Sequence, residues 1–330
     1  MQLNFVVSQP KVLAGEMLNA KVLLDSADPD TVIESLTAEM KGVGKTGWVN
    51  VHTDKIFETE KKSGFFLQLY MHAQLALCTP GMPISVGKHQ FPLQMMIPET
   101  VPSSYESQFG SIRYHVKVVL TANNGQASCS RVFPIVVVAR SFFDDLPMNV
   151  LSPIDFRDEV DFTCCSLPLG CVSLMVSLPR TVFRLGETVE AQVTVNNRTR
   201  KGLKDCALQL SMKTQFEAMS RYEHVNEKKL IEQAIELVPL GNVRSRHKQV
   251  FSGCHIRIPE GAPPTQNYNR ETGDTSIITI HYVLKLVALP GKIFWIEYEI
   301  PLVVTSMGYA DSAKDAAFVL HNQRKSPSRQ

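Results

Sequence analysis

The chain has 330 residues, of which 44% are apolar and 20% charged, and a formal net charge of +2 at pH 7. This is the composition of a globular protein long enough for two domains with hydrophobic cores, and so small a net charge excludes a general electrostatic attraction for nucleic acid or membranes. We expect a cytoplasmic protein, because the first residues lack a signal peptide, no apolar run reaches the roughly 18 residues of a membrane helix, and the seven irregularly spaced cysteines are typical of reduced thiols.

Most of the first 140 residues predict short β-strands, because apolar residues recur at every second position and turn residues separate the runs. The expected strands are two within 3–24, then 32–40, 65–71, 90–97, 112–120 and 132–139. Residues 112–120 are the clearest of them, with Ile112, Tyr114 and Val116 on one face. Gly42, Gly44 and Gly47 predict a loop around Trp48, without the signature of a phosphate-binding loop.

Residues 141–166 indicate a linker, because they are acidic, contain prolines and show no sustained period. Cys164, Cys165 and Cys171 follow closely. A structural zinc site needs four ligands at paired spacings, which this group lacks. Packing at a strand edge and acylation are the interpretations that stay open.

The second half follows the same plan, with expected strands at 206–212, 278–286 and 295–305. Residues 196–202 form a basic turn and 244–248 a basic cluster. Residues 217–238 are ambiguous, because their apolar residues have helical spacing although the duplication described next predicts strands. Residues 307–330 are a polar tail, with a short helical turn expected near 311–320.

The two halves repeat each other in sequence. Val7-Ser-Gln-Pro-Lys followed by Gly15-Glu returns as Val176-Ser-Leu-Pro-Arg followed by Gly186-Glu. Three more pairs follow in the same order: Ile97-Pro-Glu with Ile258-Pro-Glu, Ile112–Val118 with Ile280–Leu286, and Phe133–Val137 with Ile300–Val304. Four matched blocks in one order indicate a duplicated domain. We therefore predict an all-β protein of two tandem immunoglobulin-like β-sandwich domains, 1–140 and 167–306, joined by the linker 141–166 and followed by the tail 307–330.

Two blocks carry a family resemblance. Residues 173–197, Ser-Leu-Met-Val-Ser-Leu-Pro-Arg onward, resemble the opening of the C-terminal arrestin domain. Residues 98–117, Pro-Glu-Thr-Val-Pro-Ser-Ser-Tyr onward, resemble the N-terminal domain of the α-arrestins, which are the arrestin domain-containing proteins. The resemblance covers residues 3–306. It implies a cytosolic adaptor without a cofactor, whose two sandwiches bind the cytoplasmic tails of receptors or transporters and link them to endocytic sorting or to a ubiquitin ligase.

The sequence departs from the family pattern at three points. The tail contains no Pro-Pro-x-Tyr motif, and Pro263-Pro264 stands two residues too far from Tyr268, so the direct binding of a WW-domain ligase is not supported. Thr275 stands near the position where the thioredoxin-interacting member has its binding cysteine. Residues 132–135 lack the arginine that visual and β-arrestins carry in that region.

We expect the chemistry of this protein to lie on its surface. Basic residues can pair with phosphorylated tails or anionic head groups. The candidates are Lys11, Arg113 and Lys117 in the first domain and Arg198, Arg200, Lys201, Arg244, Arg246 and Lys248 in the second. No nucleophile elbow, zinc-protease motif or Walker loop indicates an enzyme. A retromer-type trafficking subunit and a peripheral module for anionic lipids are the alternative functions. A peripheral location at the plasma membrane or endosomes is the alternative to a purely cytoplasmic one.

Overall fold

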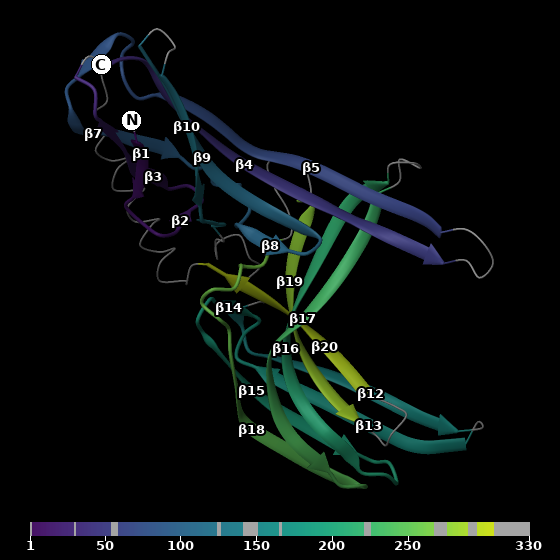
Figure 1. Cartoon of the computed structure of the whole chain (residues 1–330). Helices are drawn as coiled ribbons and strands as arrows, with labels where there is room; N and C mark the ends of the chain where they lie inside the picture. Colours follow the sequence, from purple (N-terminus) through teal and green to yellow (C-terminus); the bar gives the residue numbers. More distant parts are fainter. Residues whose placement is uncertain are drawn as a thin grey trace, which may run out of the picture. The chain divides into compact units, whose positions relative to one another are not determined.

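The computed structural model describes residues 2–29, 31–53, 59–123, 127–140, 151–164, 167–220, 226–266, 276–289 and 296–306. Its elements are β-strands (Figure 1), and the chain divides into two compact units. The first contains residues 1–140, 215–229 and 266–279, and the second contains 141–214, 230–265 and 280–330. The prediction of an all-β protein with two sandwich units is confirmed.

Two sheets enclose the core of the first unit. One has the strand order β1 (Gln2–Val7), β3 (Met17–Ser26), β7 (Gly87–Met96). The other runs β10 (Ala127–Ile135), β9 (Gly110–Ala122), β4 (Thr31–Thr53), β5 (Thr59–Ala76), with β6 (Met82–Ile84) on β4 and β8 (Tyr105–Ser107) on β9. β2 (Val12–Leu13) and β11 (Val137–Val138) form a short parallel pair. Alternate residues of β3 and β9, such as Leu18, Val22, Val116 and Leu120, are fully buried, as a period of two predicts.

The second unit repeats this plan. One sheet has the order β12 (Ile154–Cys164), β13 (Leu167–Leu178), β15 (Thr188–Asn197), β18 (His247–Arg257). The other runs β16 (Leu203–Ser220), β19 (Ile278–Leu289), β20 (Ile296–Thr305), β14 (Val182–Arg184), and β17 (Asn226–Val243) also pairs with β16. Its core includes Val176 and Val193 from the first sheet and Leu208 and Leu284 from the second.

Two segments from the second half of the sequence complete the first unit. They are residues 215–229, from β16 and β17, and 266–279, which lead into β19. The Thr46 hydroxyl donates to the Glu217 carbonyl at 2.5 Å, and the hydroxyls of Tyr70 and Ser276 lie 2.8 Å apart. Burial raises the pKa of Tyr70 to about 12, so this phenol stays protonated. The repeat in the sequence does not indicate that these two segments belong to the first unit.

The duplicated blocks have the same local geometry in both units. Gly15 and Gly186 adopt the left-handed φ angles of 83° and 82°, which glycine reaches without steric cost. The Gly15 amide donates to the Ile97 carbonyl at 2.9 Å, and the Gly186 amide donates to the Ile258 carbonyl at 3.0 Å. Each Gly-Glu turn is therefore tied to its own Ile-Pro-Glu block, which explains why the two motifs recur together.

A buried tyrosine occupies the same place in each unit. The Tyr114 hydroxyl on β9 donates to the Pro102 carbonyl, and the Tyr282 hydroxyl on β19 donates to the Pro263 carbonyl, both at 2.6 Å. Both tyrosines are among the largest fully buried side chains. A buried hydroxyl without a partner would cost about 1–3 kcal/mol, so each tyrosine fixes the loop that supplies its acceptor.

The predicted loop around Gly42, Gly44 and Gly47 is wrong, because all three glycines lie within β4. A Cβ atom on Gly42 would overlap the ring of Tyr114, and one on Gly44 would lie 2.7 Å from the ring of Tyr70. These glycines therefore allow aromatic rings to approach the strand closely. From sequence alone, the same residue type is read as a turn signal.

The predicted linker 141–166 contains regular structure where it is described, because residues 154–164 form β12 at the edge of a sheet. Ile154, Phe156 and Val160 lie half-buried on one face, and charged residues alternate with them. Asp158 interrupts the apolar face, and this interruption hid the period in the sequence. Residues 141–150 lie outside the described part of the chain.

The helical spacing within 217–238 does not correspond to a helix. The described residues of this stretch belong to β16 and β17, as the duplication predicted. The tail 307–330, including the turn expected at 311–320, lies outside the described residues.

Replacing Gly186 with alanine tests the tie between the duplicated blocks. The added Cβ is strained at a φ of 82° and lies 2.7 Å from Cγ of Glu260, so we expect Gly186→Ala to lower the free energy of unfolding by about 1–2 kcal/mol. Urea denaturation measures the change. Gly261→Ala is the matched control, because nothing lies within 4 Å of its Cβ; equal losses in the two variants would contradict this account.

Candidate functional site

Two turns at one end of the second unit carry most of the candidate basic residues. The first, 198–202, connects β15 to β16, and the second, 244–246, connects β17 to β18. β15 and β18 pair antiparallel, with Asn197 opposite His247 and Asn196 opposite Lys248. The last residues of β15 therefore lie beside the first residues of β18, and this register brings the two turns together.

The buried side chain of Asn197 joins the turns. Its Nδ2 donates to the carbonyls of Lys201 at 2.8 Å and Arg244 at 3.1 Å, and its Oδ1 accepts from the Thr199 amide and hydroxyl at 3.0 and 2.7 Å. The Arg246 amide also donates to the Thr199 carbonyl at 3.2 Å. Both amide protons of Asn197 are used inside the protein, which argues against the glycosylation that Asn197-Arg-Thr would otherwise suggest.

The structure thus gathers the six candidates of the second unit, and their side chains are all exposed. We call them the basic turn cluster: Arg198, Arg200, Lys201, Arg244, Arg246 and Lys248. Sequence analysis overlooked Lys204 and His247, which are exposed at the same strand ends. Position in the sequence could have indicated both, since His247 lies within the basic cluster 244–248 and Lys204 follows the basic turn 196–202 after one intervening residue.

Among the described residues, one carboxylate forms an ion pair with the basic turn cluster. Arg198 Nη1 lies 3.7 Å from Glu159 Oε1 on β12. Hydrogen bonds from Cys171 and Ser173 and the charge of Arg198 hold the pKa of Glu159 below its ordinary value. The same carboxylate raises the pKa of the Cys171 thiol, which disfavours the reactive thiolate. Cys165 and the side chain of Cys164 lie outside the described residues, so acylation there stays a prediction.

The first-unit candidates are not gathered in this way. Arg113 forms a two-point ion pair with Glu106, with nitrogen to oxygen distances of 2.5 and 2.8 Å. Lys117 lies half-buried on the same strand, roughly 13 Å further along at the usual rise per residue. Lys11 is exposed in the turn before β2. Arg113 therefore already has a carboxylate partner.

A second charged group lies on the sheet of the second unit that contains β16, β17, β19 and β20. We call it the Lys285 network, and its members are Lys285, Lys213, Glu232, Glu297 and Glu299. The Lys285 ammonium, whose side chain is 7% exposed, contacts Glu232 at 2.7 Å, Glu299 at 2.8 Å and Glu297. Lys213 reaches Glu299 at 2.5 Å. The three carboxylates could hold a metal ion by their spacing, but Lys285 supplies the positive charge at their centre. Burial by itself would lower the pKa of Lys285. Hydrogen bonds to the three carboxylates outweigh this effect and raise the pKa.

Comparisons with known proteins agree with the duplicated architecture. Residues 4–140 match the model of the arrestin (or S-antigen) N-terminal domain, and residues 168–309 match that of the C-terminal domain. Arrestin domain-containing protein 15 of Caenorhabditis elegans is 65% identical over 323 residues, which cover 98% of this chain and 83% of that protein. Human arrestin domain-containing protein 5 and mouse arrestin domain-containing protein 4 are each 24% identical, and the alignments cover 74% and 90% of this chain and 69% of each relative. No helix among the described residues is long and apolar enough to cross a membrane.

Replacing Lys285 with methionine should destabilise the second unit by about 3 kcal/mol at pH 7, because three carboxylates lose their shared partner. The loss should shrink toward pH 4. In the native protein, burial by itself would raise the pKa of Glu299. Hydrogen bonds from Lys213 and Lys285 outweigh this effect and lower the pKa of Glu299 below the ordinary 4.5. Their contribution to stability is therefore present above that pH and is lost as the pH falls. In Lys285→Met, protonation instead relieves the repulsion between carboxylates.

Urea denaturation between pH 4 and pH 8 measures this difference. Lys213→Met is the control, because Lys213 is paired with Glu299 alone among the three carboxylates, and its effect should be smaller. A difference between Lys285→Met and the native chain that does not change with pH would contradict the proposed role of the network.

Proposed function

Because this chain belongs to the arrestin family, in its α-arrestin branch, we propose that it is a cytoplasmic adaptor that binds the tails of membrane proteins. Arrestin-family proteins act as adaptors rather than as enzymes. In this proposal, the chain links receptor or transporter cargo to endocytic sorting or ubiquitination machinery. The absence of a Pro-Pro-x-Tyr motif from this sequence favours an indirect link to the ligase.

The observation that carries the proposal is the basic turn cluster. Five of its six cations come from two turns that Asn197 holds together. The sixth, Lys248, lies beside them near the start of β18, opposite Asn196, so the six cations form one surface. Within the described residues, the ion pair of Arg198 with Glu159 is the one that involves the cluster. Five of its cations therefore remain for an external anion. Arginine binds phosphate and carboxylate groups through two parallel hydrogen bonds.

We propose a phosphorylated or acidic tail as the ligand. A segment carrying several phosphates or carboxylates along its length could contact both turns at once. An anionic membrane surface offers the same charges, and the experiment below separates the two ligands. Binding should weaken as the salt concentration rises, because exposed charges are screened over about 8–10 Å.

Reversing three of the charges tests the proposal. We expect the variant R244E/R246E/K248E to bind a doubly phosphorylated, fluorescently labelled tail peptide roughly tenfold more weakly than the native chain, because each lost ion pair contributes a fraction of a kcal/mol to about 1 kcal/mol. The unphosphorylated peptide should be affected little. Fluorescence anisotropy measures both affinities.

The matched control is K11E/K21E/K88E, which makes the same change in net charge at exposed positions of the first unit and includes one of the first-unit candidates. If both variants weaken the binding of the phosphopeptide equally, the binding depends on net charge and not on the basic turn cluster. Sedimentation with anionic and neutral vesicles distinguishes the ligands, since binding to anionic vesicles without binding to the phosphopeptide would assign the surface to lipid.

A further inference from the structure

β17 forms a long open edge in the second unit. Among the strands that the structure describes, it pairs only with β16. Of its 18 residues, Val243 alone is buried. Leu230 and Leu237 are 60% and 54% exposed, and Ile231 and Ile235 are half-buried. The strand therefore presents apolar side chains beside a row of backbone groups that no neighbouring strand uses.

The stretch 230–238 of this edge lacks the usual protection against pairing. Proteins shield edge strands with short lengths, prolines or outward charges. β12, an edge of the other sheet, follows this rule with Asp155, Glu159 and Asp161 on its exposed face. The stretch 230–238 of β17 has no proline and no lysine. Its two carboxylates are held by partners inside the unit, as the next observations show.

Glu232 is bound to Lys285 at 2.7 Å, and Glu236 Oε2 accepts a hydrogen bond from the Arg257 backbone amide at 2.5 Å. Both carboxylates are therefore engaged by partners within the unit. Glu236 is bound to a neutral N–H group, so its negative charge stays uncompensated at this contact.

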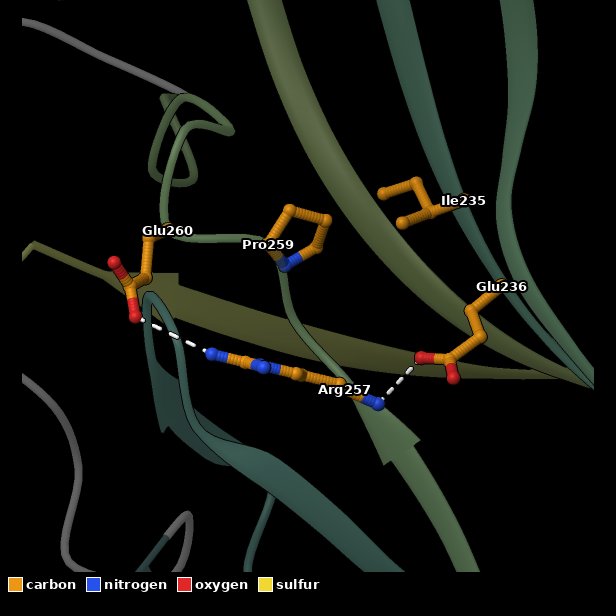
Figure 2. Close-up of a pocket in the computed structure, with 5 residues that line it drawn as sticks. All are labelled: Ile235, Glu236, Arg257, Pro259 and Glu260. Carbon is orange, nitrogen blue, oxygen red and sulfur yellow. Dashed lines mark hydrogen bonds and ion pairs between the residues drawn. The ribbon is translucent and has the colours of Figure 1, made fainter.

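An open depression of about 470 Å³ adjoins the strand (Figure 2). Its walls are Ile235 and Glu236 from β17, Arg257 at the end of β18, and Pro259 and Glu260 from the following loop. Figure 2 shows Arg257 between the two carboxylates, with its guanidinium directed to Glu260 and its backbone amide to Glu236. Two carboxylates against one guanidinium leave a surplus negative charge, beside apolar surface from Ile235 and Pro259.

We propose that an extended, basic peptide adds to the open edge of β17 as a further strand and places a lysine or arginine side chain in this depression. Main-chain hydrogen bonds supply the pairing, as in other cases of strand addition. The aliphatic stem of the basic side chain packs on Ile235 and Pro259, and its charge neutralises Glu236.

Charge favours such a peptide over a second copy of this chain. Residues 230–238 contain two glutamates and no cation, so two copies of β17 paired along this stretch would bring acidic strands together, which is unfavourable. The ligand differs in charge from the one proposed for the basic turn cluster, so the two proposals are independent.

The test uses a labelled nine-residue peptide of alternating threonine and valine with a central lysine. We expect it to bind the full chain and to slow hydrogen exchange of the amides in 230–238. Two versions, N-methylated at either the odd or the even positions, serve as backbone controls. Because alternate amides of a strand point to opposite sides, one version should lose binding and the other keep it. Equal retention or equal loss in both versions, or protection elsewhere alone, would overturn the proposal.

Substitutions in the chain test the role of the depression. Glu236→Gln keeps an acceptor for the Arg257 amide but removes the charge, so we expect roughly fivefold weaker binding of the lysine peptide. Binding of a peptide with central norleucine should not change. Glu190→Gln, an exposed site on β15, is the matched control. If Glu236→Gln weakens the binding of both peptides equally, the charge of Glu236 does not select a basic side chain.

Two further measurements separate this inference from its alternatives. The variant R244E/R246E/K248E should bind the lysine peptide as the native chain does, whatever its behaviour toward phosphopeptides. Sedimentation velocity of the free chain should show no dimer that depends on β17. A dimer in which 230–238 are protected from exchange would assign the edge to a second copy and overturn the proposal.

Discussion

Both units depend on a buried tyrosine whose hydroxyl must find an acceptor inside the protein. Tyr114 and Tyr282 lie on equivalent strands and donate to the carbonyls of Pro102 and Pro263. Leaving either hydroxyl unsatisfied would cost about 1–3 kcal/mol, so the loop that supplies the acceptor is held over the strand. The ring of Tyr114 also needs space, which Gly42 provides on β4. The same interaction in both halves of the chain is expected if a stable β-sandwich domain was duplicated.

The candidate functional site also depends on a buried polar side chain, because Asn197 positions the exposed charges of the two turns. The Asn197 side chain donates a hydrogen bond to each of two turns, and the acceptors, the carbonyls of Lys201 and Arg244, lie 4 and 47 residues along the chain from it. Such a network satisfies the backbone groups of the turns and fixes their relative position. The arginines and lysines of the two turns then form the single surface that we propose for an anionic ligand. The positions of the cations follow from a residue that would not itself touch the ligand.

Two edge strands of the second unit, β12 and β17, differ in the charges that they present. β12 carries outward acids, whereas the carboxylates of β17 are held by Lys285 and by the Arg257 amide. The Lys285 network therefore has a consequence beyond stability, because it pairs the Glu232 carboxylate, a charge that could otherwise guard the edge. Together, the two proposals give the second unit separate binding surfaces for two ligands of opposite charge.

The sequence by itself determined the strands, the faces they bury and the duplication, because a period of two and repeated glycine and proline blocks are local signals. Residues 112–120 and their counterpart could be read in this way, and so could the family. Only the tertiary structure decided that Gly42 and Gly44 lie inside a strand, that 154–164 form an edge strand, and that 215–229 and 266–279 complete the first unit. It also decided that the two basic runs converge while Arg113 is neutralised. These outcomes depend on strand register and on hydrogen bonds between residues distant in sequence, and no local pattern of residues encodes them.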